Sequence, residues 1–226
     1  MKELLKQYPL TGGLILLNLF AYLFCILLSG DVIDMNLQVL VDMGALYGPL
    51  VVLKGEWWRL FSAMFLHGGM THILMNMVSL YIVGRGVESY YTKSAYLALY
   101  LFSGLIGALA SLAVHPQSVG IGASGAIFGL FGALAGFFLA HRAQIAAYSR
   151  EFMKDFVAII GINLFLGLAI PSIDMSAHIG GLISGFIGGY MLAKRPNSLW
   201  VYVLLMFMAV LGGMAYLFGY YAQLYR

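Results

Sequence analysis

The feature that most constrains this chain is a series of long stretches without a single charged side chain. A membrane helix needs about 20 consecutive apolar residues, and soluble domains carry roughly 25% charged residues. Here only 9% of the 226 residues are charged, and the mean hydropathy is +0.91. The sequence therefore predicts an all-α, polytopic membrane helix bundle. The charge-free stretches are 7–30, 60–84, 94–141, 156–173, 175–193 and 196–225.

The stretch 94–141 is long enough for two spans, because His115-Pro116-Gln117-Ser118 supplies a polar, helix-breaking turn near its middle. The sequence thus predicts seven membrane helices. Residues 31–59 contain six charged side chains, and we expect them to form a long loop between the first two spans. We expect residues 1–195 to form a six-helix core and residues 196–226 to add a C-terminal transmembrane helix.

Lysine and arginine counts predict the orientation of the bundle. With a cytoplasmic N-terminus, nine basic residues lie in inner segments and three in outer ones, so the positive-inside rule predicts the N-terminus inside and the C-terminus outside. Because no transit peptide or appended soluble domain is evident, we expect a prokaryotic plasma membrane. The inner residues are Lys2, Lys6, Arg85, Lys93, Arg142, Arg150, Lys154, Lys194 and Arg195, and the outer ones Lys54, Arg59 and Arg226.

Composition argues against several classes of partner and cofactor. A net charge of +3 interrupted by apolar runs is too dilute for a nucleic-acid surface. The single cysteine, Cys25, provides neither a disulfide framework nor a thiolate zinc site. His72 and His178 could approach one another, but the third ligand would be Asn76 or Ser124, which are poor zinc ligands. We therefore expect no metal and no cofactor.

Polar side chains inside the spans are functional candidates by default. The second, fourth and sixth spans contain these polar side chains, and all three cross the membrane in the same direction. In each span the polar side chains lie in the first turns. They are therefore expected at the same depth in the membrane. The candidates are His67, Thr71, His72, Asn76 and Ser79 in the second span, Ser124 at the start of the fourth and His178 near the start of the sixth. His72, Asn76 and Ser79 share one helical face, whereas His67 points elsewhere.

Glycines form a narrow stripe along the fourth span and another along the sixth. Small residues spaced in this way let two membrane helices approach to backbone contact. If the stripes face each other, they bring Ser124 and His178 together at one end of the seam; a glycine zipper with a coincidental Ser/His pair is the alternative. The stripes are Gly125, Gly129, Gly132 and Gly136, and Gly181, Gly185 and Gly189.

The chemistry available to these groups is specific. A serine hydroxyl becomes a nucleophile when an imidazole accepts its proton, which His178 could do for Ser124. Gly122-Ala123-Ser124-Gly125 places the serine where a helix begins, so unpaired backbone N–H groups are available to stabilise an oxyanion. His72 and Asn76 could add side-chain donors.

Four separated motifs, in the same order along the chain, resemble those of the rhomboid intramembrane serine proteases. The resemblance extends over about residues 10–195. The motifs are Trp58-Arg59 in the first loop, His67-x4-His72-x3-Asn76, Gly122-Ala123-Ser124-Gly125 and Ala177-His178-x2-Gly181-x3-Gly185.

The resemblance implies Ser124 as nucleophile and His178 as general base and acid. It also implies an oxyanion hole made by His72, Asn76 and the Ser124 backbone N–H. Phe128 falls where the family often has an aromatic residue beneath the catalytic imidazole. Glu88 matches an acidic position that the family keeps; from its spacing alone, we expect it to pair with Arg85.

The family's partners are transmembrane segments of membrane-protein substrates within membrane lipid, cleaved near the outer face. Since the family works with a Ser–His dyad, Asp174 is expected to serve as the N-cap of the sixth span rather than as a third catalytic residue. Two alternatives remain. One is a catalytically silent rhomboid-like protein that binds membrane helices, and the other is a small-solute or proton transporter with a histidine relay.

Overall fold

The computed structural model describes residues 2–144, 161 and 173–225. Within them the chain forms a bundle of six long helices, which confirms the predicted all-α class. The long helices are α2 (Pro9–Ser29), α5 (Met70–Tyr90), α6 (Lys93–Val114), α7 (Ser124–Ala140), α9 (Met175–Lys194) and α10 (Leu199–Leu224). The expected fifth span, 156–173, lies almost wholly outside the described residues.

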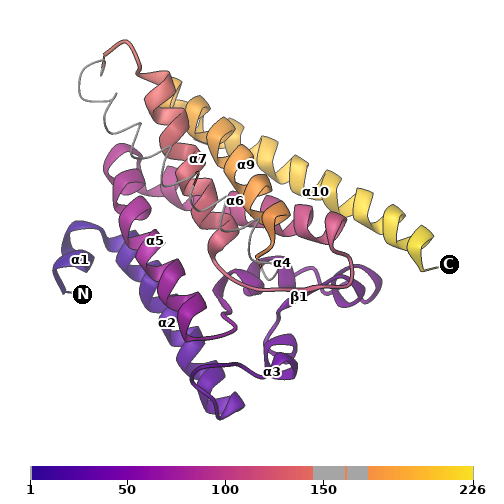
Figure 1. Ribbon diagram of the computed structural model, residues 1–226. Helices are drawn as coiled ribbons and strands as arrows, with labels where there is room; N and C mark the ends of the chain where they lie inside the picture. The colour runs from indigo at the N-terminus through magenta and orange to yellow at the C-terminus, as the bar shows by residue number, and fades with distance from the viewer. Residues whose placement is uncertain (1, 145–160, 162–172, 226) are drawn as a thin grey trace.

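Three segments of the described chain are long and apolar enough to cross a membrane: Pro9–Ser29, Lys93–Val114 and Pro196–Leu224. The helix α7 is apolar but shorter, whereas α5 and α9 carry the polar side chains and glycines that the sequence singled out. We call the end of the bundle at which α6 ends and α7 and α9 begin the site end. Figure 1 shows α10 running beside α9 and ending at the C-terminus.

The second span starts later than predicted. Residues 59–65 form two short turns, α4 (Arg59–Ser62) and η2 (Ala63–Phe65), and the backbone becomes extended at Leu66 before α5 begins at Met70. His67 therefore lies in the connection before the helix and not within a span. At its other end α5 continues beyond the expected residue 84 to Tyr90, so Glu88 lies in its last turn.

The first loop is more ordered than the sequence indicated. It contains α3 (Leu37–Asp42), the short strand β1 (Leu46–Tyr47) and a π-helical turn, η1 (Pro49–Leu53). The strand β1 pairs antiparallel with β2 (Val119–Gly120), which lies in the connection between α6 and α7. The first loop is thereby joined to the segment that leads into α7. The remaining elements are α1 (Lys2–Gln7) and η3 (Pro196–Ser198).

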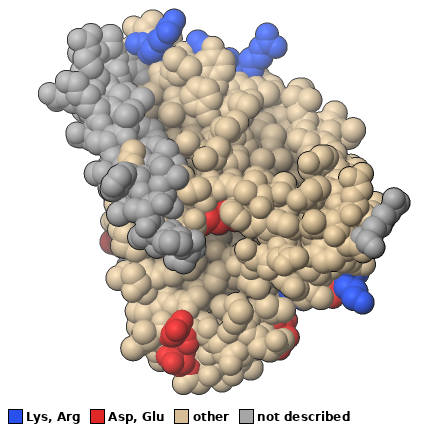
Figure 2. Space-filling view, turned by 45° about the vertical axis from the view of Figure 1, so that its right-hand side comes forward, with Lys and Arg blue, Asp and Glu red and all other residues tan. Residues whose placement is uncertain are grey.

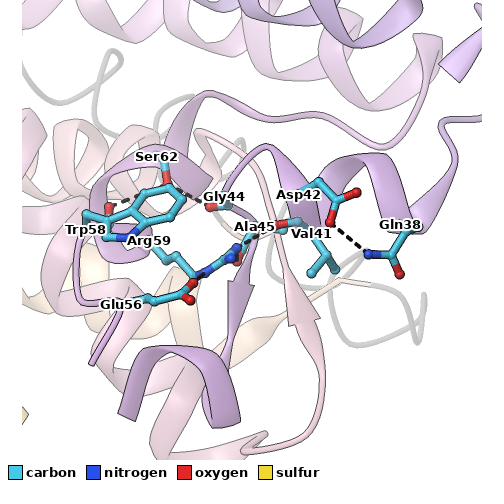
Figure 3. A network of polar contacts seen from close by, with 9 residues as sticks. All are labelled: Gln38, Val41, Asp42, Gly44, Ala45, Glu56, Trp58, Arg59 and Ser62. Atoms are coloured by element: carbon cyan, nitrogen blue, oxygen red, sulfur yellow. Dashed lines mark hydrogen bonds and ion pairs between the residues drawn. The ribbon is translucent and has the colours of Figure 1, made fainter. Parts of the chain in front are cut away.

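Arg59 holds the first loop together. Its Nε donates to the Glu56 carboxylate at 2.6 Å, and its Nη1 donates to the carbonyl oxygens of Val41 and Ala45 at 2.6 and 3.1 Å. The guanidinium also lies 4.7 Å from the ring centroid of Trp58 (Figure 3). A buried guanidinium with several acceptors organises the surrounding backbone. The Trp58-Arg59 motif is thus a brace for the loop.

Glu88 fixes the start of α2 to α5. Its carboxylate accepts the backbone N–H groups of Leu10 and Thr11 at 2.8 and 2.9 Å, and the Thr11 hydroxyl at 2.7 Å. These donors are the unpaired N–H groups of a helix N-terminus, where a negative charge is favoured. Arg85 instead lies over Tyr81, 3.9 Å from the ring centroid. The expected Arg85–Glu88 pair is therefore wrong.

Charge divides between the two ends of the bundle. Arg85, Lys93 and Lys194 lie near the end opposite Ser124, whereas Asp31 and Asp42 belong to the first loop at the site end. Figure 2 shows a surface that is almost uncharged, with most of the visible basic groups at its upper edge, a further basic group beside an acidic one at the lower right, and acidic groups mainly lower down. An uncharged belt between two charged ends is the surface expected of a protein that spans a bilayer.

Candidate active site

Ser124 occupies the first position of α7, as the sequence predicted, and it is half-buried. The chain enters this helix through Gly122, whose φ of +117° is a conformation that L side chains rarely adopt. The Gly122 backbone N–H donates to the Ala63 carbonyl oxygen at 2.9 Å, which fixes the turn against η2. The free N–H groups of the first turn of α7 lie at the serine.

The glycine stripes of α7 and α9 face each other, which meets the condition set by the sequence. A methyl group on Gly181 would overlap the Gly125 carbonyl oxygen, and one on Gly185 would overlap that of Gly129. At the site end of the seam, a Cβ on Gly125 would lie 3.4 Å from the Ala177 carbonyl oxygen. The neighbours of Ser124 and His178 in sequence therefore meet across the seam, which requires glycine because the backbones touch.

The His178 ring is buried and stacks on Phe128. The ring centroids are 4.2 Å apart and the planes differ by 13°. Phe128 lies one turn after Ser124 on α7, so the stack holds the imidazole of α9 against the helix that begins with the serine. This is the arrangement expected from the aromatic residue at this position.

His72, in the first turn of α5, presents its Nε2 to the serine turn. A Cβ on Gly122 would lie 2.8 Å from His72 Nε2 and 3.8 Å from Ser124 Oγ, so both atoms border the same point. The backbone N–H of Gly68 donates to His72 Nδ1 at 3.4 Å. Because Nδ1 accepts, the proton of the neutral ring lies on Nε2, and the atom that faces the serine turn is a hydrogen-bond donor.

Asn76 is buried on α5, one turn after His72, and its Nδ2 donates to the His72 carbonyl oxygen at 3.0 Å. This bond uses one of the two amide hydrogens and leaves the other for a ligand. His67 is fully buried and meets the His72 ring edge to face, with centroids 5.0 Å apart. His67 supports His72 by packing.

Asp174 caps α9. Its carboxylate accepts the backbone N–H groups of Ser176 and Ala177 at 3.0 and 3.2 Å. Burial raises the pKa of this carboxyl, but hydrogen bonds from Ser111, Ser176 and Ala177, together with His115, outweigh it, so the pKa lies below its ordinary value. His178 Nδ1 has no hydrogen-bond partner among the described residues. The N-cap role expected for Asp174 is confirmed.

Comparison with known proteins assigns this sequence to a family. The Rhomboid domain matches residues 54–195, which contain Ser124, His178, His72 and Asn76. The chain belongs to the rhomboid family. The match ends before α10, so the seventh helix of the prediction lies beyond the family's shared domain.

Several rhomboid proteins are similar to this chain. Rhomboid protease GluP of Bacillus subtilis is 42% identical over 151 residues, which cover 67% of this chain and 29% of GluP. RHOMBOID-like protein 6, mitochondrial, of Arabidopsis thaliana is 38% identical over 167 residues, 72% of this chain and 52% of that protein. The putative rhomboid protease YdcA of Bacillus subtilis is 33% identical over 149 residues, 66% of this chain and 73% of YdcA. The chain thus spans only part of the first two relatives.

The family match and the apolar helices make this chain a rhomboid and an integral, multi-pass membrane protein. The sequence did not predict two backbone groups that hold the site in place. Gly68 donates to His72 and Ala63 accepts from Gly122, and neither role depends on a side chain that a motif could reveal.

Proposed function

We propose that this rhomboid is an intramembrane serine endopeptidase that cleaves transmembrane helices of membrane proteins near the outer face of the bilayer. Ser124 and His178 act as a catalytic dyad. The observation that carries the proposal is the stack of His178 on Phe128, one turn below Ser124, on helices whose backbones touch along the glycine seam.

In this mechanism the Ser124 hydroxyl attacks the scissile carbonyl carbon while His178 accepts its proton. The tetrahedral oxyanion is stabilised by His72 Nε2–H, the Ser124 backbone N–H and the remaining Asn76 amide hydrogen. His178 then protonates the leaving amine, and water hydrolyses the acyl-enzyme with His178 again as base. Asp174 takes no part, because its carboxylate is engaged by the start of α9.

Substrates are transmembrane segments that contain helix-weakening residues. In an intact helix the carbonyl groups are hydrogen-bonded and covered, so a serine can attack only where the substrate helix unwinds. No nucleic acid and no cofactor enter this mechanism, and membrane lipid surrounds the reaction.

The N-terminus is proposed to be cytoplasmic. The concentration of Arg85, Lys93 and Lys194 at the end opposite Ser124 supports this orientation through the positive-inside rule. Single cysteines at Asp42 and Ser198 in intact cells test it, since an impermeant reagent should label only the first; the native Cys25 is buried. The prokaryotic plasma membrane stays a prediction, because the relatives come from a bacterium and a plant.

The first test of the chemistry is covalent labelling of the protein in liposomes with a fluorophosphonate. Ser124→Ala and His178→Ala should both abolish labelling, whereas Ser89→Ala, at the opposite end of the bundle, should label like the wild type. Absence of labelling in a folded wild type would remove the dyad and favour the catalytically silent helix-binding protein. The second test is cleavage of a single-span peptide, with the cut mapped by mass spectrometry.

A further inference from the structure

The end of α10 is buried against the segment that leads to Ser124. Tyr221 has no exposed surface, although much of α10 is exposed. Its hydroxyl lies 3.0 Å from the Leu112 carbonyl oxygen and 3.1 Å from that of Pro116, and it donates to this pair. Leu112 is in the last turn of α6, and Pro116 lies in the connection between α6 and α7. The C-terminal helix therefore holds the beginning of that connection.

The connection, residues 115–123, is held at two further points. Its strand β2 pairs with β1 of the first loop, and Gly122 donates to Ala63. Ser124 follows directly as the first residue of α7. The tie at Pro116, the β1–β2 pairing and the Gly122–Ala63 hydrogen bond therefore act on one short segment that ends at Ser124.

A glycine of the first loop is required where these segments meet. A Cβ at Gly48 would overlap both the Tyr221 hydroxyl and the Pro116 carbonyl oxygen. A second apolar cluster, separate from the main core, surrounds this point and joins the first loop, α6 and α10. It includes Leu46, Val51, Leu112, Val210 and Leu217. The first loop, the connection and α10 thus form one packed unit at the site end.

We propose that Tyr221 is a positioning residue for Ser124, through which α10 holds the connection 115–123 and thereby the serine turn. The proposal rests on the proposed function, in which Ser124 is the nucleophile. It assigns a role in catalysis to a helix that lies outside the matched Rhomboid domain. The tie is suited to this role because a hydrogen bond buried away from water is expensive to leave unmade, so the Pro116 and Leu112 carbonyl groups stay fixed.

The test compares Tyr221→Phe with the wild type in nanodiscs, using the full chain. Tyr216→Phe is the matched control, because Tyr216 is on the same helix and 65% exposed. Amide hydrogen exchange reports the order of residues 115–123 without requiring activity, and kcat and KM on a single-span substrate report catalysis. Thermal unfolding shows whether the variant is folded.

With the ring retained and the hydroxyl removed, we expect exchange in 115–123 to accelerate about 5-fold, as for one lost hydrogen bond. We expect kcat to fall about 5- to 20-fold with KM within about 2-fold, because small displacements of reacting atoms reduce the rate of chemistry. Gly48→Ala, which keeps the hydroxyl but displaces it, should give the same pattern. Tyr216→Phe should change none of these quantities.

The proposal is overturned if Tyr221→Phe leaves exchange and kcat at wild-type values. It is also overturned if exchange rises evenly over the whole protein, or if KM changes while kcat does not. If the wild type neither labels nor cleaves, and Tyr221→Phe still accelerates exchange only in 115–123, the positioning of the segment stands and the protease function fails.

Discussion

The His178 imidazole lies flat on the Phe128 ring, 4.2 Å from it between centroids, so one aromatic residue fixes the plane of the proposed base. Phe128 also meets Phe131 edge to face, with centroids 6.0 Å apart, so the ring beneath the imidazole is itself supported by α7. His178 Nδ1 has no hydrogen-bond partner among the described residues, so within this part of the chain apolar packing and not a carboxylate orients the ring.

Replacing Phe128 tests this arrangement. An aromatic stack contributes about 0.5–1.5 kcal/mol beyond its buried area, and about 1.4 kcal/mol is a factor of ten, so Phe128→Ala should lower kcat about 2- to 10-fold, whereas Phe128→Tyr should keep most activity. Steady-state cleavage of a single-span substrate measures both, with the exposed Phe218→Ala as control. Equal activity of Phe128→Ala and wild type would show that the stack does not orient the base.

The glycine seam predicts which substitutions separate α7 from α9. Gly181→Ala should destabilise the protein by about 1–3 kcal/mol or more and abolish labelling of Ser124, because its methyl group would overlap the Gly125 carbonyl oxygen. Gly212→Ala on α10 is the matched control, since a Cβ at this position would meet no atom within 4 Å. Thermal unfolding and fluorophosphonate labelling are the measurements; a Gly181→Ala protein that melts and labels normally would contradict the seam.

Much of the bundle follows from sequence because charge marks the ends of its helices. The charge at Lys93 and the turn near Pro116 predict the two ends of α6. Gly122 and Ser124 predict where α7 begins. The start of α5 was missed by ten residues, because the apolar run 60–69 packs as short turns and an extended segment, which hydropathy does not distinguish from helix. The Arg85–Glu88 pair was wrong for a related reason. Glu88 contacts residues 77 and 78 positions away, which i,i+3 spacing cannot reveal.

The tautomer set by Gly68 gives His72 a defined role as donor. Removing one oxyanion-hole donor reduces kcat about 10²- to 10³-fold, so His72→Ala should lower kcat by this factor and leave KM nearly unchanged. Single-turnover cleavage separates the chemical step from substrate binding. A rise in KM with unaltered kcat would instead make His72 a substrate-binding residue.

The cap at Asp174 separates stability from catalysis. Asparagine keeps the side-chain oxygen that caps the helix, so Asp174→Asn should keep most activity and lose only the contribution of the charge, whereas Asp174→Ala loses the cap and about 1 kcal/mol of stability. A loss of activity in Asp174→Asn as severe as that of Ser124→Ala would make Asp174 a third member of the catalytic group.

The same carboxyl predicts a pH dependence. Because its pKa in the folded protein lies below its ordinary value of about 3.9, its charge stabilises the fold above that pH, and the contribution is lost as pH falls further. The difference in unfolding temperature between wild type and Asp174→Asn should therefore be constant above about pH 5 and shrink at lower pH. A constant difference down to pH 3 would show that Asp174 does not titrate as described.

Glu88 should matter for stability and little for the chemical step, since it ties α2 to α5 far from Ser124. Hydrogen bonds to a charged group contribute about 1.5–3 kcal/mol. Glu88→Gln removes the charge that the α2 N-terminus favours, so the free energy of unfolding should fall by about this amount.

Arg85→Gln, which removes the neighbouring charge but none of these bonds, is the control and should have a smaller effect. Chemical denaturation in mixed micelles gives both free energies, and kcat of the folded Glu88→Gln fraction should remain within about 2-fold of wild type. Equal destabilisation by the two variants would mean that Arg85 and Glu88 act as a pair after all.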